Sequence, residues 1–114
     1  MSDRRVSAGA GRLDPAAVFA ALGDPTRLSL VGKLSADPRL SISRLAEGSA
    51  LTRQAVTKHL RVLENAGVVA SERSGREILY SLEPAPIAEM RAYLDGISRQ
   101  WDDALARLKA FVEE

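Results

Sequence analysis

The stretch 52–66 places hydrogen-bond donors on one side of a predicted helix and apolar side chains on the other. Val56, Leu60 and Leu63 recur at helical spacing, while Thr52 and Gly67 are typical of a helix start and a helix end. Side chains of this outer face reach base edges or bind phosphates when a helix enters DNA. The pattern predicts a DNA-contacting helix, and the alternative is an ordinary solvated face. The predicted contacts on and beside this face are Thr52, Arg53, Gln54, Thr57, Lys58 and Arg61.

The charges around this helix favour the first interpretation. Between Arg39 and Arg61 the chain holds five basic residues and one acid, a local net charge of +4 that can support phosphate binding. Arg73 and Arg76 flank a glycine-containing turn, where they can lie along a DNA backbone or in a minor groove. The alternative for this basic tip is that Glu72 and Glu77 pair with its arginines. We expect Arg73 and Arg76 to contact DNA.

Composition excludes several other kinds of chemistry. The 114 residues include no cysteine and one histidine, a poor donor set for zinc or copper and none for a disulfide. No nucleophile elbow, phosphate loop or paired-carboxylate motif is present, so we expect no enzyme, no cofactor and no metal site. Without an apolar run of about 20 residues or a signal peptide, we expect a cytoplasmic protein with no membrane partner.

The positions of prolines, glycines and helix-capping residues predict the helices and strands that hold these side chains in place. We expect an N-terminal arm over 1–13, helices over 16–22 and from 25 to about 36, and a short helix capped by Ser43. The helix 52–66 follows, then a β-hairpin with strands over 68–73 and 77–82, and then a helix over about 86–113 behind two prolines. This order predicts one mainly α-helical domain over 14–114 with a small β-hairpin wing, a winged helix-turn-helix.

The final helix has a narrow apolar stripe that a single domain could hardly cover. Its length of about 40 Å and its spacing of three and four residues suit helix-on-helix packing with a second copy. Two-fold symmetry would then place two DNA-contacting helices about 34 Å apart and predicts a palindromic double-stranded operator. On this helix the predicted homodimer interface comprises Met90, Leu94, Ile97, Trp101, Leu105 and Leu108.

The net charge of +1 averages over two regions with opposite charge. Residues 1–82 hold 12 basic and 8 acidic residues, a net +4, whereas residues 83–114 hold 4 basic and 7 acidic, a net −3. The basic region carries the proposed DNA-contacting elements, and the acidic region carries the proposed dimer helix. A competing hypothesis is a winged-helix module that binds another protein and has no DNA specificity.

Several single residues admit more than one role. His59 lies at the edge of the buried stripe, which favours a structural histidine bonded to backbone or facing a phosphate over a ligand or catalyst. Trp101 is expected to pack in the core or dimer interface, with a ligand pocket as the alternative. Asp24 and Arg27 can pair or cap the second helix, and the alternative for Arg27 is that it approaches DNA.

Three segments, ALGDPTRLSLVGKL (21–34), TRQAVTKHLRVLENAGVV (52–69) and RSGREILYSL (73–82), resemble the ArsR family of winged helix-turn-helix transcriptional repressors. The resemblance implies a homodimer that binds an imperfect inverted repeat and is released by a signal. It also implies that the first and last helices form the interface, which adds Val18 and Leu22 to the predicted interface residues. In metal-sensing members, cysteines near the short helix or carboxylates and histidines on the final helix hold the metal. The stretch 40–45 has no cysteine and the stretch 87–114 has no histidine, so both metal sites of the family are missing. The candidates for what relieves repression are then a small molecule, a protein effector or a change in concentration alone.

Overall fold

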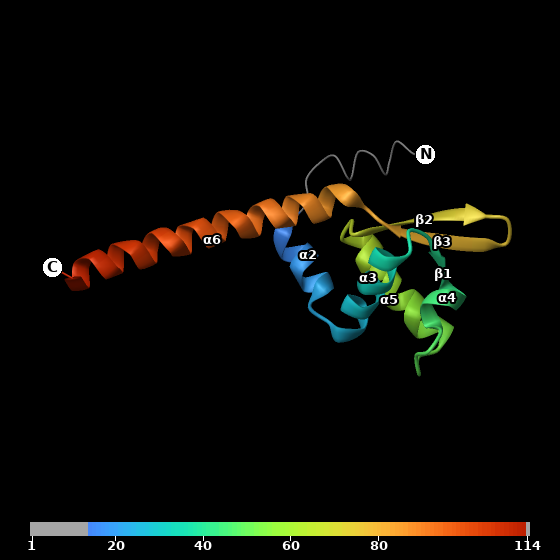
Figure 1. Ribbon diagram of the computed structural model, residues 1–114. Helices are drawn as coiled ribbons and strands as arrows, with labels where there is room; N and C mark the ends of the chain where they lie inside the picture. The colour runs from blue at the N-terminus through green and yellow to red at the C-terminus, as the bar shows by residue number, and fades with distance from the viewer. Residues whose placement is uncertain (1–13, 114) are drawn as a thin grey trace. The chain divides into compact units, whose positions relative to one another are not determined.

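A computed structural model describes residues 14–113, and the predicted arm over 1–13 lies outside the described residues. The described chain divides into two compact units, residues 14–84 and residues 85–113. Within this range the first unit contains four helices and a three-stranded sheet, and the second is one long helix (Figure 1). The predicted mainly helical fold with a β-hairpin is confirmed.

Two aspartate-proline pairs start the first two helices, as the sequence predicts. Helix α2 (Pro15–Leu22) begins after Asp14, whose Oδ1 accepts a hydrogen bond of 3.1 Å from the Ala16 amide. Helix α3 (Pro25–Ala36) begins after Asp24, whose Oδ2 accepts one of 3.0 Å from the Arg27 amide. Proline at the first helical position has no amide hydrogen to leave unpaired, so each pair fixes a helix start.

The helix-turn-helix is formed by α4 (Ile42–Ala46) and α5 (Arg53–Asn65). The prediction that Ser43 caps α4 was wrong: Ser41 is the cap, because it is extended and its hydroxyl accepts from the Arg44 amide at 3.2 Å. Thr52 caps α5 by accepting from the Ala55 amide at 3.0 Å, which confirms the predicted start. The chain leaves α5 at Gly67, whose φ of 84° is a conformation that favours glycine.

Strands β2 (Val69–Ser74) and β3 (Glu77–Leu82) form the predicted hairpin, with Gly75 in the left-handed region at its tip. The sheet has a third strand, β1 (Leu40–Ser41), that was not predicted from the sequence. It pairs antiparallel with β3, placing Leu40 opposite Tyr80, and gives the order β1-β3-β2. This pairing joins the start of α4 to the base of the hairpin.

The core of the first unit is aliphatic. Its side chains come from each described helix of that unit and from the chain entering β2, so α5 is held by packing along its whole inner face. The side chains with at most 3% exposure include Val18, Leu30, Leu34, Leu45, Val56, Leu60, Leu63 and Val68.

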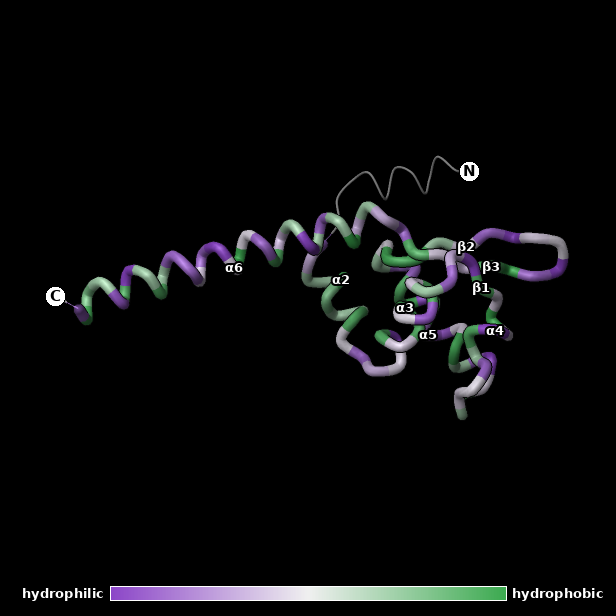
Figure 2. Tube along the Cα trace, in the orientation of Figure 1, coloured by the Kyte–Doolittle hydropathy of each residue, from purple (hydrophilic) through white to green (hydrophobic). Residues whose placement is uncertain are grey.

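Helix α6 (Pro84–Glu113) starts two residues earlier than the expected residue 86. Prolines are tolerated in a first helical turn because the amides there lack intrahelical partners, so Pro84 and Pro86 lie inside the helix rather than before it. Hydrophobic and hydrophilic residues alternate along α6 (Figure 2). Within residues 14–113, no helix combines the length and the apolar composition that crossing a membrane requires.

Candidate nucleic-acid interface

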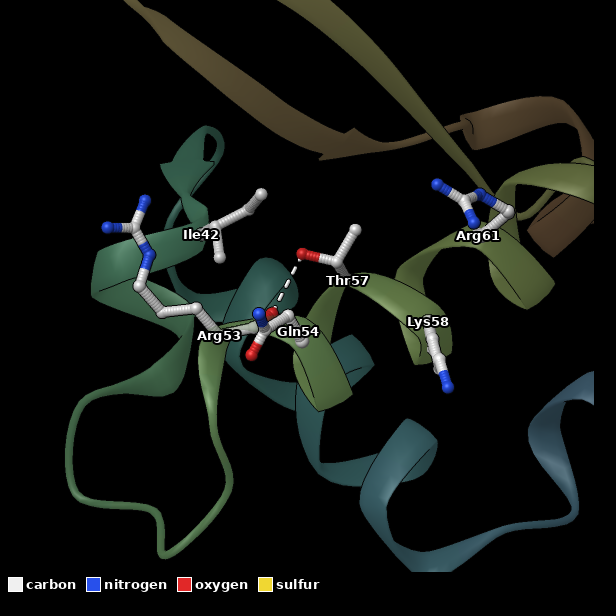
Figure 3. A pocket seen from close by; sticks show the side chains of 6 residues that line it. All are labelled: Ile42, Arg53, Gln54, Thr57, Lys58 and Arg61. Atoms are coloured by element: carbon white, nitrogen blue, oxygen red, sulfur yellow. Dashed lines mark hydrogen bonds between the residues drawn. The ribbon is translucent and has the colours of Figure 1, made fainter.

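The outer face of α5 borders an open depression whose wall is completed by α4 (Figure 3). Five of the predicted contact residues line it, and they come from successive turns of α5 because their spacing of three and four residues places them on one side. Ile42 of α4 also lines the depression. It was not predicted, because the sequence of a short apolar segment does not show which of its side chains packs next to the following helix. The lining residues are Ile42, Arg53, Gln54, Thr57, Lys58 and Arg61.

Four of these side chains are available for a ligand. Arg53, Gln54, Lys58 and Arg61 are exposed. Among residues 14–113, none of the four side chains takes part in a hydrogen bond or an ion pair. Three cations and an amide that have no partner within this range form a surface that suits phosphates and base edges.

The basic excess predicted over 39–61 is partly neutralised. Arg39 pairs with Glu72 at 3.1 Å, and Arg44 pairs with Glu47 at 3.6 Å, with all four side chains at least half exposed. Exposed pairs of this kind contribute little to stability, but they reduce the positive potential around them. The cations left without an acid partner between 39 and 61 are therefore those of α5.

The hairpin of β2 and β3 projects from the helices of the first unit (Figure 1). Arg73 and Arg76, near its tip, are exposed. Glu72 pairs with Arg39 rather than with a neighbouring arginine. No ion pair within the described range involves Arg73 or Arg76, so the alternative that these arginines are neutralised by acids beside them is not supported. At the base of the hairpin, burial raises the pKa of Tyr80, which keeps its hydroxyl neutral.

Arg27 links α2, α3 and α5. Its Nε donates to the Ala21 carbonyl at 2.6 Å, and its Nη1 lies 3.2 Å from His59 Nδ1. Because a guanidinium only donates, His59 Nδ1 is the acceptor of this hydrogen bond when it carries no proton. His59 was expected to be a structural histidine bonded to backbone or facing a phosphate, and the structure gives its ring a side-chain partner 32 residues away instead. Arg27 faces inward and positions α5.

Asp24 caps α3 and lies 3.9 Å from His59 Nδ1. The hydrogen bond from the Arg27 amide, together with the charges of Arg27 and His59, lowers the pKa of Asp24 despite the opposing effect of partial burial. The capping role expected from the sequence is confirmed.

We expect Asp24→Asn to change the pH dependence of stability. A lowered folded-state pKa means that the ionised carboxylate stabilises the fold above the ordinary aspartate pKa of about 3.9, and that this stabilisation disappears as the pH falls through the lowered value. Asparagine retains a capping oxygen without the charge. Urea midpoints should therefore favour the natural protein at pH 7 and converge with those of the variant near pH 2. Asp102→Asn, an exposed position in α6, should match the natural protein at both pH values.

Lys33 holds the end of α4, a role that was not predicted from the sequence. Its Nζ donates to the Leu45 carbonyl at 3.0 Å and to the Glu47 carbonyl at 3.2 Å. A cation at a helix C-terminus satisfies carbonyls that lack intrahelical partners. Lys33 thereby fixes the start of the turn that leads into α5.

The predicted dimer-interface residues differ in how much surface they leave exposed. Val18 and Met90 are buried in the single chain, and Leu22 and Ile97 are half-buried. The remaining four leave more than half of each side chain exposed on α6: Leu94, Trp101, Leu105 and Leu108.

Comparisons with known proteins place this geometry among DNA-binding regulators. A helix-turn-helix domain model matches residues 22–72, the segment that contains α3, α4 and α5. The chain is 36% identical over 91 residues to the HTH-type transcriptional regulator Rv2034 of Mycobacterium tuberculosis, covering 80% of this chain and 81% of that protein. It is 35% identical over 85 residues to the HTH-type transcriptional repressor SmtB of the same species, covering 75% of this chain and 61% of that protein.

A solved structure gives the same result. The ArsR-like transcriptional regulator from Rhodococcus sp. RHA1 is 38% identical, with a TM-score of 0.74, and the match covers 85% of this chain and 91% of that one. The similarity therefore extends over most of the described fold.

Proposed function

The chain belongs to the ArsR family of winged helix-turn-helix transcriptional regulators, and from this premise we propose that it is a repressor that binds an inverted-repeat operator as a homodimer. As a member of this family it is a DNA-binding regulator of transcription and not an enzyme. The repressor role is supported by the similarity to a relative that is named a repressor.

The observation that carries the proposal is the outer face of α5. Gln54, Lys58 and Arg61 are exposed there, and their side chains form no hydrogen bond or ion pair within residues 14–113. In a helix-turn-helix the second helix enters the major groove, where side chains of its outer face contact base edges. We assign base contacts to Gln54, Lys58 and Arg61, and backbone contacts to Thr52, Arg53 and the wing residues Arg73 and Arg76.

The dimer is proposed from α6. Leu94, Trp101, Leu105 and Leu108 are between 51% and 63% exposed, an apolar stripe that costs free energy in water. A second copy of the same helix offers a matching stripe under two-fold symmetry. The winged domain over 14–114 would then present two copies of α5 to successive major grooves, which requires a palindromic site.

Fluorescence anisotropy with DNA fragments tiled across the chain's own upstream region tests the proposal. Lys58→Ala and Arg61→Ala should each weaken binding to the specific fragment by about 1–3 kcal/mol, because each removes a base contact. Circular dichroism should show unchanged folding, since both side chains are exposed. Affinity of the natural protein should also fall steeply between about 50 and 200 mM salt.

Matched controls separate base contact from loss of charge. Lys109→Ala and Arg107→Ala remove the same charges from exposed positions of α6 and should leave operator affinity nearly unchanged. Equal binding by Lys58→Ala, Arg61→Ala and the natural protein would exclude the assigned face. Weak binding to every fragment without salt dependence would favour the protein-interaction alternative over sequence-specific repression.

A further inference from the structure

The depression on α5 contains an apolar spot among its polar groups. Ile42 and Thr57 lie beside Arg53, Gln54 and Lys58, and both are only partly exposed. Figure 3 shows Ile42 on α4 and Thr57 on the side of α5 that faces α4. Apolar groups beside two cations and an amide suit a ligand whose surface carries both charged or polar groups and apolar groups.

The hydroxyl of Thr57 is already used within the helix. Its Oγ1 donates to the Arg53 carbonyl at 2.8 Å, which fixes the side-chain rotamer. The hydroxyl therefore turns toward the helix backbone, and the methyl group points outward from α5 (Figure 3). Thr57 thus keeps its hydrogen-bond donor for the helix and leaves its methyl group free for a ligand, while Ile42 lines the same depression from α4.

The charges around the spot indicate what covers it. Arg53 and Lys58 border it, and neither has an acid partner among the described residues. A polyanion with apolar groups between its charges is complementary to this arrangement. In the DNA major groove the 5-methyl group of thymine is the apolar group presented beside base-edge donors and acceptors, and threonine methyls and other apolar side chains contact it.

We propose that Ile42 and the Thr57 methyl group form a pocket for the 5-methyl group of one thymine in each operator half-site. The inference rests on the proposed function and adds a specificity determinant to it. Thymine carries that methyl group in the groove and cytosine does not, so the pocket selects a T·A pair over a C·G pair at one position. Gln54 and Lys58, on either side, would then read the neighbouring base edges.

Replacing single thymines of the operator with deoxyuridine tests this directly, because the substitution removes the methyl group and keeps base pairing. At one symmetric pair of positions, uracil should weaken binding about fourfold per half-site, the factor expected for one buried carbon group. Other thymines should show little change. Binding is measured by fluorescence anisotropy at one fixed salt concentration.

Two variants of Thr57 identify the contact. Thr57→Ser keeps the hydroxyl that bonds Arg53 and removes the methyl, so the variant should discriminate less between thymine and uracil operators than the natural protein does. Thr57→Val keeps the methyl and should retain the fourfold preference. Ile42→Ala should reduce that preference, and Val62→Ala, an exposed apolar position of α5 outside the depression, should not.

The outcomes separate this inference from the proposed function. Specific binding with no uracil-sensitive position overturns the methyl pocket and leaves the repressor proposal intact. A uracil effect that persists fully in Thr57→Ser also overturns it, since DNA deformability rather than the side chain would then carry the preference. Absence of specific binding to any tiled fragment overturns both the proposed function and the pocket.

Discussion

Replacing Leu60 with alanine should lower the free energy of unfolding by about 2–5 kcal/mol, because the change leaves a cavity in a packed core. Leu60 has 0% exposure and lies on the inner face of α5, which carries the proposed base contacts. Loss of this magnitude is a large part of the stability of a small domain. Operator binding should weaken as well, because a fraction of the protein would be unfolded.

Urea unfolding followed by far-ultraviolet circular dichroism measures the effect. Protein concentration must be equal in all samples, since dimerisation would couple to folding. Val62→Ala is the matched control: it shortens an apolar side chain on the same helix that is 39% exposed, and it should cost less than about 1 kcal/mol. Similar losses in both variants would mean that α5 is not held by its inner face.

Helix α5 was predictable because all its determinants are local. The Thr52 cap, the spacing of Val56, Leu60 and Leu63, and the left-handed Gly67 all lie within one short stretch, and the structure confirms each of them. The outward face then follows from helix geometry alone. Its residues could therefore be identified as a candidate DNA-contacting face from the sequence alone.

The features that were not predicted depend on partners distant in the chain. Strand β1 has two residues and exists because Leu40 pairs with Tyr80, so no local pattern signals it. Ser41 rather than Ser43 caps α4 because that pairing keeps Ser41 extended. The Arg27 contact with His59 spans 32 residues. Each of these contacts requires the tertiary fold, which periodicity does not specify.

The same distinction explains what could be predicted of the site. The cations of α5 were visible in the sequence, but the pairing of Arg39 with Glu72 was not, so the local excess over 39–61 overstated the free positive charge. Ile42 was missed because its place beside Thr57 depends on how α4 packs on α5. Sequence periodicity thus identified the polar groups of the site, whereas the apolar group needed the fold.

Replacing Trp101 with glutamate should convert the protein from a dimer to a monomer at micromolar concentration. Trp101 is 63% exposed in the single chain and lies in the apolar stripe of α6. In the proposed dimer the change would bury a carboxylate without a partner on each side of the two-fold axis, at a cost of several kcal/mol per ion. Sedimentation equilibrium measures the change in mass.

Operator affinity should fall with the dimer. Two linked DNA-contacting helices bind more tightly than one by about 10²–10⁴-fold, because the second half-site is engaged at high effective concentration. Trp101→Glu should lose that factor on the full operator while binding a single half-site as the natural protein does. Ala106→Glu is the control, since it adds the same charge at an exposed position about 140° around α6. It should remain dimeric with unchanged affinity. A Trp101→Glu protein that stays dimeric and binds the full operator normally would show that another surface joins the two subunits.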